Sequence, residues 1–140
     1  MGGSLRSVGN KDLFTPFGIW VREYCRPSDT GLSVTNVDFF FEDFRNKRSL
    51  FLEEKQSGGI LHYAQRLSFA VMDAAMAHPN SGYDHWGFFV LTMPYGRTMP
   101  GPGMMLNDAP ITCEQLIQHL NFEKKFCTGL VLGRAPSRSS

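Results

Sequence analysis

The 140-residue chain has few cysteines and no long apolar run, and each shortage excludes a class of protein. Its three cysteines, Cys25, Cys113 and Cys127, lack the spacing of a metal-binding cluster. We therefore expect free thiols in a reducing compartment, and neither a disulfide-stapled secreted domain nor a zinc finger. No segment approaches the roughly 20 apolar residues of a membrane span, and the start lacks the apolar region of a signal peptide. The sequence predicts a soluble, cytoplasmic protein, encoded by a cell or by a phage in its host, with no membrane partner.

The chain also lacks a strong net charge. Fourteen Lys and Arg residues against 13 Asp and Glu residues give a formal net charge of +1, so any nucleic-acid site has to be a local patch. There is no glycine-rich phosphate loop followed by Lys-Ser/Thr, no nucleophile elbow and no tandem repeat. P-loop nucleotide hydrolysis, serine-hydrolase chemistry and solenoid folds are therefore not expected.

What is present is the composition of a globular domain with an aromatic core. Hydrophobic residues make up 42% and charged residues 19%, and there are 12 phenylalanines. A chain of this length is long enough to bury a core as one domain. We predict a flexible leader over 1–12, a single domain over 13–132 and a flexible tail over 133–140.

The most informative stretch is 37–55, which reads as two strands joined by a charged turn. Asp38 lies on the first strand, and the second ends in Glu53-Glu54-Lys55. Since side chains alternate along a strand, Glu53 and Lys55 share one face and Glu54 takes the other. A hairpin brings Asp38 beside Glu53, and two carboxylates with a nearby carbonyl suit a hard cation such as Mg²⁺. The alternative is an ordinary amphipathic hairpin whose Glu54 and Lys55 face solvent.

Asp38, followed after a gap by Glu53-X-Lys55, resembles the PD-(D/E)XK nuclease superfamily over roughly residues 15–93. Val37 stands where the superfamily often has proline. The resemblance implies an α/β, restriction-endonuclease-like core in the order helix, β-hairpin, strand, helix, strand, with a central mixed sheet flanked by helices. It implies Mg²⁺ or Mn²⁺ held by Asp38, Glu53 and the main-chain carbonyl of Glu54. Lys55 would orient the attacking water and stabilise negative charge.

Two further residues are candidates through the same resemblance. In some branches an acid from the first helix joins the metal site, and Glu23 is the acid available on the helix expected over 15–26. The alternative for Glu23 is a solvated acid paired with a neighbouring arginine. One exonuclease branch carries a Q-x-x-x-Y motif on the next helix. Here Gln65 matches the glutamine, while Phe69 stands at the tyrosine position.

The basic residues that are the best candidates to bind the phosphates of a nucleic acid lie in the hairpin turn. Arg45, Lys47 and Arg48 form the densest basic cluster in the chain, and Arg66 lies on the following helix. A solvated hairpin tip and a solvated helix face are the alternatives.

The remaining elements are predicted from periodicity and capping. A strand over 32–43 is expected to be buried on both faces, and a helix from Ile60 should end before Pro79. A buried strand over 86–93 should follow it through a parallel, right-handed crossover.

No regular element fits 94–110, which we interpret as a substrate-covering or dimer-contact loop. A short helix should follow Thr112, and an edge strand is expected over 127–132. The inward residues of the two later helices are predicted to be Tyr63, Ala64, Leu67, Ala70, Val71, Ala74 and Ala75, and then Leu116, Ile117 and Leu120.

Together these features predict a metal-dependent phosphodiesterase acting on DNA, structure- or end-directed, in repair, recombination or phage DNA processing. Small nucleases of this kind often pair as homodimers, which places one active site on each strand. Two alternatives stay open: an RNA-directed nuclease, and a catalytically silent binding or assembly subunit with the same fold.

Overall fold

The computed structural model describes residues 16–24 and 37–132, which belong to two separate units, 1–36 and 37–140. In the first unit, α1 (Pro16–Tyr24) confirms the predicted helix over its described part. The rings of Phe17 and Trp20 stack at 5.8 Å, and those of Trp20 and Tyr24 lie 5.2 Å apart. The predicted leader and tail lie outside the described residues. The single domain predicted over 13–132 stays a prediction, because each unit is described by itself.

The second unit is built on a five-stranded mixed sheet, as the predicted α/β class requires. Along the sheet the strands follow the sequence order β1 (Phe39–Asp43), β2 (Arg48–Gln56), β3 (Asp84–Met93), β4 (Met105–Leu106) and β5 (Ala109–Pro110). β2 and β3 are parallel, while the other neighbours are antiparallel. The parallel pair is connected through α2 (Tyr63–Ala77), the predicted crossover. Between β2 and α2 the described residues contain no separate strand, so that part of the predicted order is not seen.

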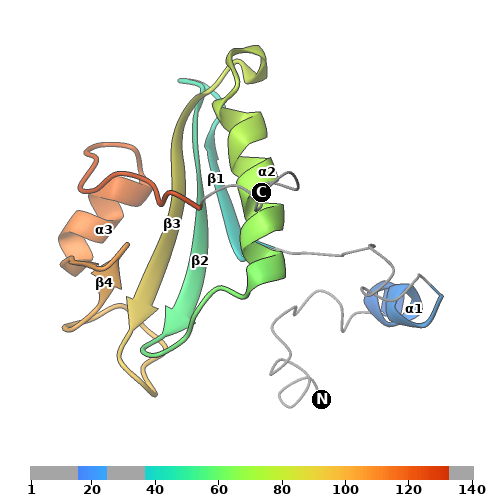
Figure 1. The fold of residues 1–140 in the computed structure, drawn as a ribbon. Coiled ribbons are helices and arrows are strands. Elements are labelled where there is room, and N and C mark those ends of the chain that lie inside the picture. Colours follow the sequence, from blue (N-terminus) through green and yellow to red (C-terminus); the bar gives the residue numbers. More distant parts are fainter. Residues whose placement is uncertain (1–15, 25–36, 133–140) are drawn as a thin grey trace, which may run out of the picture. The chain divides into compact units, whose positions relative to one another are not determined.

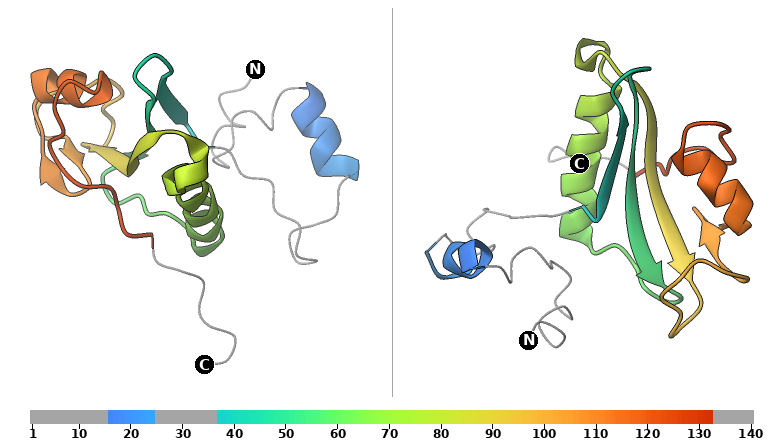
Figure 2. Two further views of the ribbon diagram at one scale, coloured as in Figure 1. Left: turned by 90° about the horizontal axis from the view of Figure 1, so that it is seen from above. Right: turned by 180° about the vertical axis from the view of Figure 1, so that it is seen from behind.

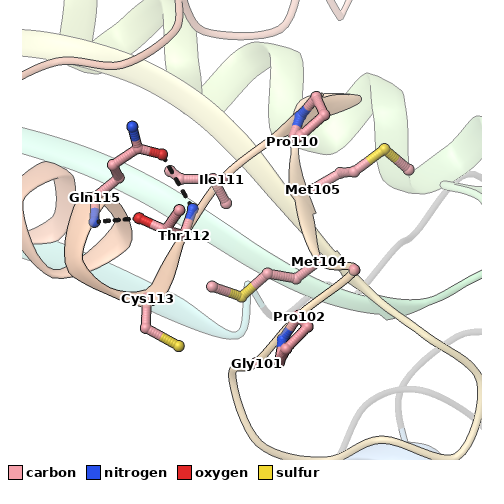
Figure 3. A pocket seen from close by; sticks show the side chains of 10 residues that line it. Gly101, Pro102, Met104, Met105, Pro110, Ile111, Thr112, Cys113 and Gln115 are labelled. Carbon is pink, nitrogen blue, oxygen red and sulfur yellow. Dashed lines mark hydrogen bonds between the residues drawn. The ribbon is translucent and has the colours of Figure 1, made fainter.

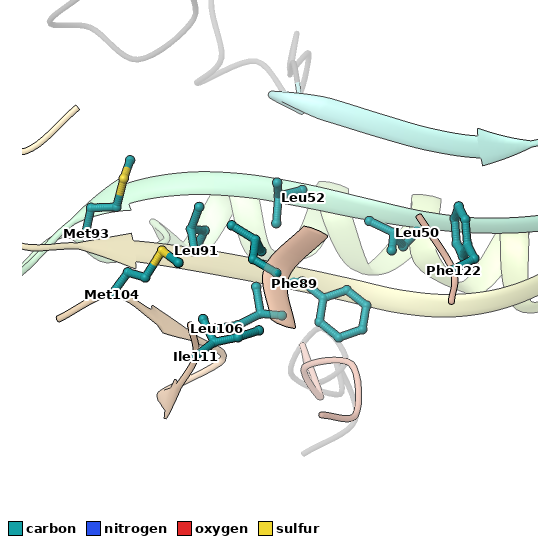
Figure 4. Close-up of a cluster of buried hydrophobic side chains, with 10 residues drawn as sticks. Leu50, Leu52, Phe89, Leu91, Met93, Met104, Leu106, Ile111 and Phe122 are labelled. Atoms are coloured by element: carbon teal, nitrogen blue, oxygen red, sulfur yellow. The ribbon is translucent and has the colours of Figure 1, made fainter. Parts of the chain in front are cut away.

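Helices cover the two faces of this sheet. α2 lies against one face and α3 (Cys113–Leu120) against the other (Figures 1 and 2). Alternation along β2 supplies both layers: Phe51 packs with Phe69 of α2 and Phe88 of β3. Leu50 and Leu52 point the other way, into a cluster with Phe89 and Met104 (Figure 4). None of the helices within 16–24 and 37–132 is long and apolar enough to cross a membrane.

The structure corrects the predicted inward face of α2. Tyr63 is 59% exposed and Val71 is 72% exposed, whereas Phe69 is fully buried. Met72 and Met76 pack beside Phe69, and of the predicted set Ala70 joins them. The helix carries two apolar stripes, and the sheet selects the one with the aromatic ring that stacks on Phe88 at 4.5 Å.

The first strand of the hairpin is shorter and more exposed than predicted. β1 begins at Phe39, and 32–36 lie outside the described residues. Phe39 and Phe40 are 49% and 41% exposed, so burial on both faces was wrong. The reason is position, because among the described residues β1 is an edge strand whose strand neighbour is β2.

The segment 94–110 also contains structure that the sequence did not predict. β4 and β5 form a small hairpin, and Asn107 and Asp108 at its turn have φ of 49° and 66°. Such angles suit the two central residues of a tight hairpin turn, where Asn and Asp are tolerated. The absence of a regular element over the whole of 94–110 was therefore wrong.

The C-terminal part follows the predicted helix but not the predicted strand. Thr112 caps α3: its Oγ1 accepts from the Gln115 N–H at 3.1 Å, and its own N–H donates to Gln115 Oε1 at 3.0 Å. Leu116 is buried, but Ile117 is 58% exposed and the inward position is taken by His119. Residues 127–132 form no strand, although the Leu130 N–H donates to the Phe88 carbonyl at 2.8 Å.

Candidate active site

The hairpin brings Asp38 and Glu53 together. β1 pairs with β2 so that Phe39 faces Leu52. Asp38 lies in the bend just before β1 and not on the strand as predicted, and hydrogen bonds place it beside Glu53 and Glu54 of β2. The Asp38 N–H donates to Glu53 Oε1 at 3.0 Å. In return, Asp38 Oδ2 accepts from the Glu54 N–H at 2.9 Å. Each acid is therefore held by the backbone of the opposite strand, just where β1 begins.

Glu53 lies in an environment that is costly for a carboxylate. It is 3% exposed and shares the α2-covered face of β2 with Phe51. An ionised group in such a place needs hydrogen bonds or a cation to offset its lost hydration. The Asp38 N–H supplies one hydrogen bond. A bound cation would add a stronger compensation.

Lys55 completes the group on the same face. It lies two residues beyond Glu53 on β2, about 7 Å along the strand, and is partly buried. It faces Thr92 of β3 in the parallel register. As predicted, Glu53 and Lys55 thus lie on one face of β2, and Glu54 lies on the other.

The donor set fits a magnesium-like ion. Asp38 and Glu53 offer two carboxylates on neighbouring strands, and the ion keeps several of its own waters when protein ligands are few. Among residues 16–24 and 37–132, no group of three or more His, Cys, Asp or Glu side chains is placed to hold a metal. Two carboxylates and a main-chain carbonyl do not require such a group. Glu23 lies on α1, in the other unit, and its role stays a prediction.

Gln65 has a local task in the helix that follows. Its Oε1 accepts from the His62 N–H at 3.1 Å and so caps the start of α2. α2 begins at the end of the sheet where β2 ends, the end that carries Glu53 and Lys55 (Figure 1). A catalytic role for Gln65 stays a prediction, and the observed hydrogen bond explains its presence without one.

The basic residues lie at the other end of the hairpin. Arg45 and Lys47 are exposed in the turn, and Arg48 begins β2, about 17 Å along the strand from Glu53. Arg48 donates to Asp43 Oδ2 at 2.8 Å and to the Phe122 carbonyl at 2.7 Å.

The hydrogen bonds in the hairpin turn change the pKa of Asp43, and Arg66 on α2 also has a partner. A hydrogen bond from the Asn46 side chain, together with Arg48, lowers the pKa of Asp43 to about 2. Arg66, on α2, donates to the Leu132 carbonyl at 3.2 Å. Arg48 and Arg66 thus have partners within the fold, and all four nucleic-acid contacts stay predictions.

One residue that positions the site escaped the sequence analysis. Gln56, the last residue of β2, donates from Nε2 to the Arg97 carbonyl at 2.8 Å and accepts from the Gly96 N–H at 2.8 Å. It thereby anchors the loop after β3 beside the end of β2. A glutamine at a strand end carries no signal of such a long-range contact.

A buried polar chain at the far end of the sheet was also missed. Ser49 Oγ lies 2.7 Å from His85 Nδ1, and His85 Nε2 lies 2.7 Å from Asp73 Oδ1. Ser49 is fully buried and inaccessible to a substrate. The chain joins α2 to β2 and β3, and we interpret it as a structural clamp.

A sizeable cavity lies away from the carboxylates. It has a volume of about 690 Å³ and is bordered by the 101–105 segment, the β4–β5 hairpin and the start of α3 (Figure 3). Its walls are apolar apart from Thr112, Cys113 and Gln115, and two of these form the α3 cap. It contains no group suited to phosphoryl transfer.

Comparison of the chain with protein-family models, with curated proteins and with solved structures finds no match. The geometry of the site is therefore what bears on function.

Proposed function

We propose that the chain is a metal-dependent nuclease of the PD-(D/E)XK type that cleaves DNA. The observation that carries the proposal is the hydrogen-bonded juxtaposition of Asp38, just before β1, and Glu53 of β2, with Lys55 two residues further on the same face. The order hairpin, helix, parallel strand supports it, because this order places the acids at the end of a sheet backed by α2.

Each residue has a distinct task in this proposal. Asp38, Glu53 and the main-chain carbonyl of Glu54 would hold Mg²⁺ or Mn²⁺. The ion, when bound, lowers the pKa of a coordinated water and neutralises charge on the phosphate. Lys55 would orient the attacking water and offset the negative charge that develops as the phosphodiester bond breaks. The backbone hydrogen bonds between Asp38 and the Glu53-Glu54 segment keep the carboxylates in place.

The small size of the unit limits how the substrate is chosen. Within residues 37–132, few elements beyond the sheet and its two α-helices are present to read a base sequence, which favours structure- or end-directed cleavage in repair, recombination or phage DNA processing. A homodimer would present one site to each strand of a duplex. RNA is the alternative substrate.

A non-catalytic binding or assembly subunit is the second candidate. It is favoured by one observation: both acids already accept hydrogen bonds from the hairpin backbone, so they have a structural explanation without a metal.

Cleavage of labelled linear, nicked, branched and single-stranded DNA with Mg²⁺ or Mn²⁺ tests the proposal. We expect Asp38→Asn and Lys55→Ala each to lower the cleavage rate at least about 100-fold, the usual effect of losing a group that stabilises transition-state charge. Asp38→Asn keeps an acceptor for the Glu54 N–H, so folding is preserved. Asp108→Asn and Lys124→Ala are matched exposed controls and should cleave at the wild-type rate.

Cutting that survives in both site variants would assign the activity to another site or to a contaminant. An inert wild-type protein that also gains no thermal stability from Mg²⁺ would favour the binding subunit.

A further inference from the structure

A second, smaller cavity lies on the opposite face of the sheet from Glu53. It has a volume of about 220 Å³, and we call it the Glu54 pocket. Its walls are formed by the apolar side chains of β1, β2 and β3 with one carboxylate among them, namely Phe39, Phe41, Leu52, Leu91, Met93 and Glu54. The loop after β3 and the inner side of α3 border the remainder.

The carboxylate of Glu54 makes this pocket chemically distinct. Glu54 is partly buried, and among the residues that the structure describes its carboxylate has no hydrogen-bond or ion-pair partner. A carboxylate beside apolar walls is stabilised by an N–H or O–H donor. The pocket therefore suits an occupant that is flat and apolar over most of its surface and carries a donor at one edge.

The aromatic side chains define the shape of that occupant. Phe39 is 49% exposed although it borders the pocket, and its ring lies 6.2 Å from that of Phe41 at 46°. An exposed ring at a pocket is a platform on which a planar ligand can stack. The volume is below the roughly 300 Å³ at which pockets begin to hold drug-sized ligands, so one ring system fits.

The pocket adjoins the candidate active site through the backbone. Phe39 follows Asp38, and Glu54 lies between Glu53 and Lys55. Asp38 Oδ2 accepts from the Glu54 N–H at 2.9 Å, which joins the two sites directly. Within the part of the chain that the structure describes, β1 is the edge strand, so a ligand that crosses this edge reaches both faces of the sheet.

We propose that the Glu54 pocket binds a single unpaired nucleobase with an exocyclic amino group, next to a phosphate bound through the metal ion at Asp38 and Glu53. This inference rests on the proposed nuclease function and narrows its substrate to DNA with an unpaired nucleotide at the cleavage position. Phe39 stacks on the base, and Glu54 accepts a hydrogen bond from its amino group, as carboxylates do from cytosine N4. Thymine has no amino group, and its N3–H lies between two carbonyl oxygens that a carboxylate repels, so thymine binds less well.

Binding of short, labelled oligo(dC) and oligo(dT) in EDTA, which prevents metal-dependent cleavage, tests this directly. We expect the wild type to bind oligo(dC) several-fold more tightly, and CMP to displace it better than TMP. Glu54→Gln should remove the preference. Phe39→Leu should weaken binding of both oligonucleotides about tenfold through lost stacking. The matched controls Glu123→Gln and Phe44→Leu change exposed residues of the same types outside the pocket and should bind as the wild type does.

The outcomes separate this proposal from the proposed function. Normal cleavage with equal binding of the two oligonucleotides and no effect of Glu54→Gln would overturn the pocket assignment and leave the nuclease intact. Base-selective binding without any cleavage would support the pocket and overturn catalysis. Displacement by N-acetyl-arginine amide but not by CMP would assign the pocket to a basic side chain of a protein partner. Competition by CMP and TMP uses the wild type alone, so the test holds even if a variant fails to fold.

Discussion

His119 illustrates how a single buried residue can make folding depend on pH. It is fully buried on the inner side of α3, with the rings of Trp86 and Phe89 at 5.3 Å and 4.5 Å. The Phe126 N–H donates to His119 Nδ1 at 3.1 Å, so the imidazole is neutral in the folded protein. Burial, aided by the charge of Lys125, lowers the pKa of His119 to about 4.

This pKa predicts a loss of stability in mild acid. An unfolded histidine titrates near pH 6.5, so below that pH the unfolded chain binds a proton at this residue. In the folded protein His119 binds that proton only near pH 4. The free energy of unfolding should fall as the pH drops from 6.5 to 4, by at most about 1.4 kcal/mol per unit. His119→Gln should remove this part of the slope in urea denaturation measured across that range. Parallel pH profiles for the two proteins would contradict the assignment.

At the scale of elements, the β4–β5 hairpin depends on one asparagine. Asn107 forms the two hydrogen bonds to Val90 of β3 that a neighbouring strand would form. Its N–H donates to the Val90 carbonyl at 2.9 Å, and its Oδ1 accepts from the Val90 N–H at 2.7 Å. Its Nδ2 donates to the Thr128 carbonyl at 2.9 Å and to the Phe88 carbonyl at 3.3 Å. One side chain thus connects the hairpin, the sheet and the C-terminal segment.

Removing that side chain should loosen the whole α3 side of the sheet. Asn107→Ala leaves the Val90 N–H without its acceptor, which costs about 1–3 kcal/mol of unfolding free energy. Asp108→Ala is the matched control, because Asp108 also has a positive φ but no described side-chain hydrogen bond. Urea unfolding of both variants measures the difference. An equal loss in both would mean that turn conformation, and not the hydrogen bonds, is the cause.

For the whole molecule, the proposed metal site couples ligand binding to folding. The carboxylates come from the bend before β1 and from β2, which meet only in the folded state, so an ion bound there stabilises that state alone. At ten times the dissociation constant the stabilisation is about 1.4 kcal/mol.

A thermal unfolding series with Mg²⁺ measures this coupling. We expect the melting temperature of the wild type to rise by several degrees at that concentration, and to rise by a similar step with each further tenfold increase in Mg²⁺. Glu53→Gln keeps an acceptor for the Asp38 N–H but removes the charge, so its melting temperature should respond little to Mg²⁺. A rise of the same size in this variant would show that the ion acts elsewhere.

The sequence by itself determined the features that depend on local chemistry. The charged turn before the apolar run of Leu50 to Leu52 and the apolar run over 86–93 specify strands, and the Thr112 cap specifies the start of α3, because each signal lies within a few residues. The placement of Glu53 and Lys55 on one face of β2 follows from the period of a strand, which needs no tertiary information.

Tertiary structure decided what depends on partners distant in sequence. α2 has two apolar stripes, and only packing on Phe51 and Phe88 determines that Phe69 is the buried residue. The exposure of Phe39 depends on β1 being an edge strand, and the roles of Gln56 and Asn107 depend on segments 17 or more residues away. The facing of Asp38 and Glu53 combines both causes: the residues predict a hairpin, and the register of the folded sheet aligns the two carboxylates.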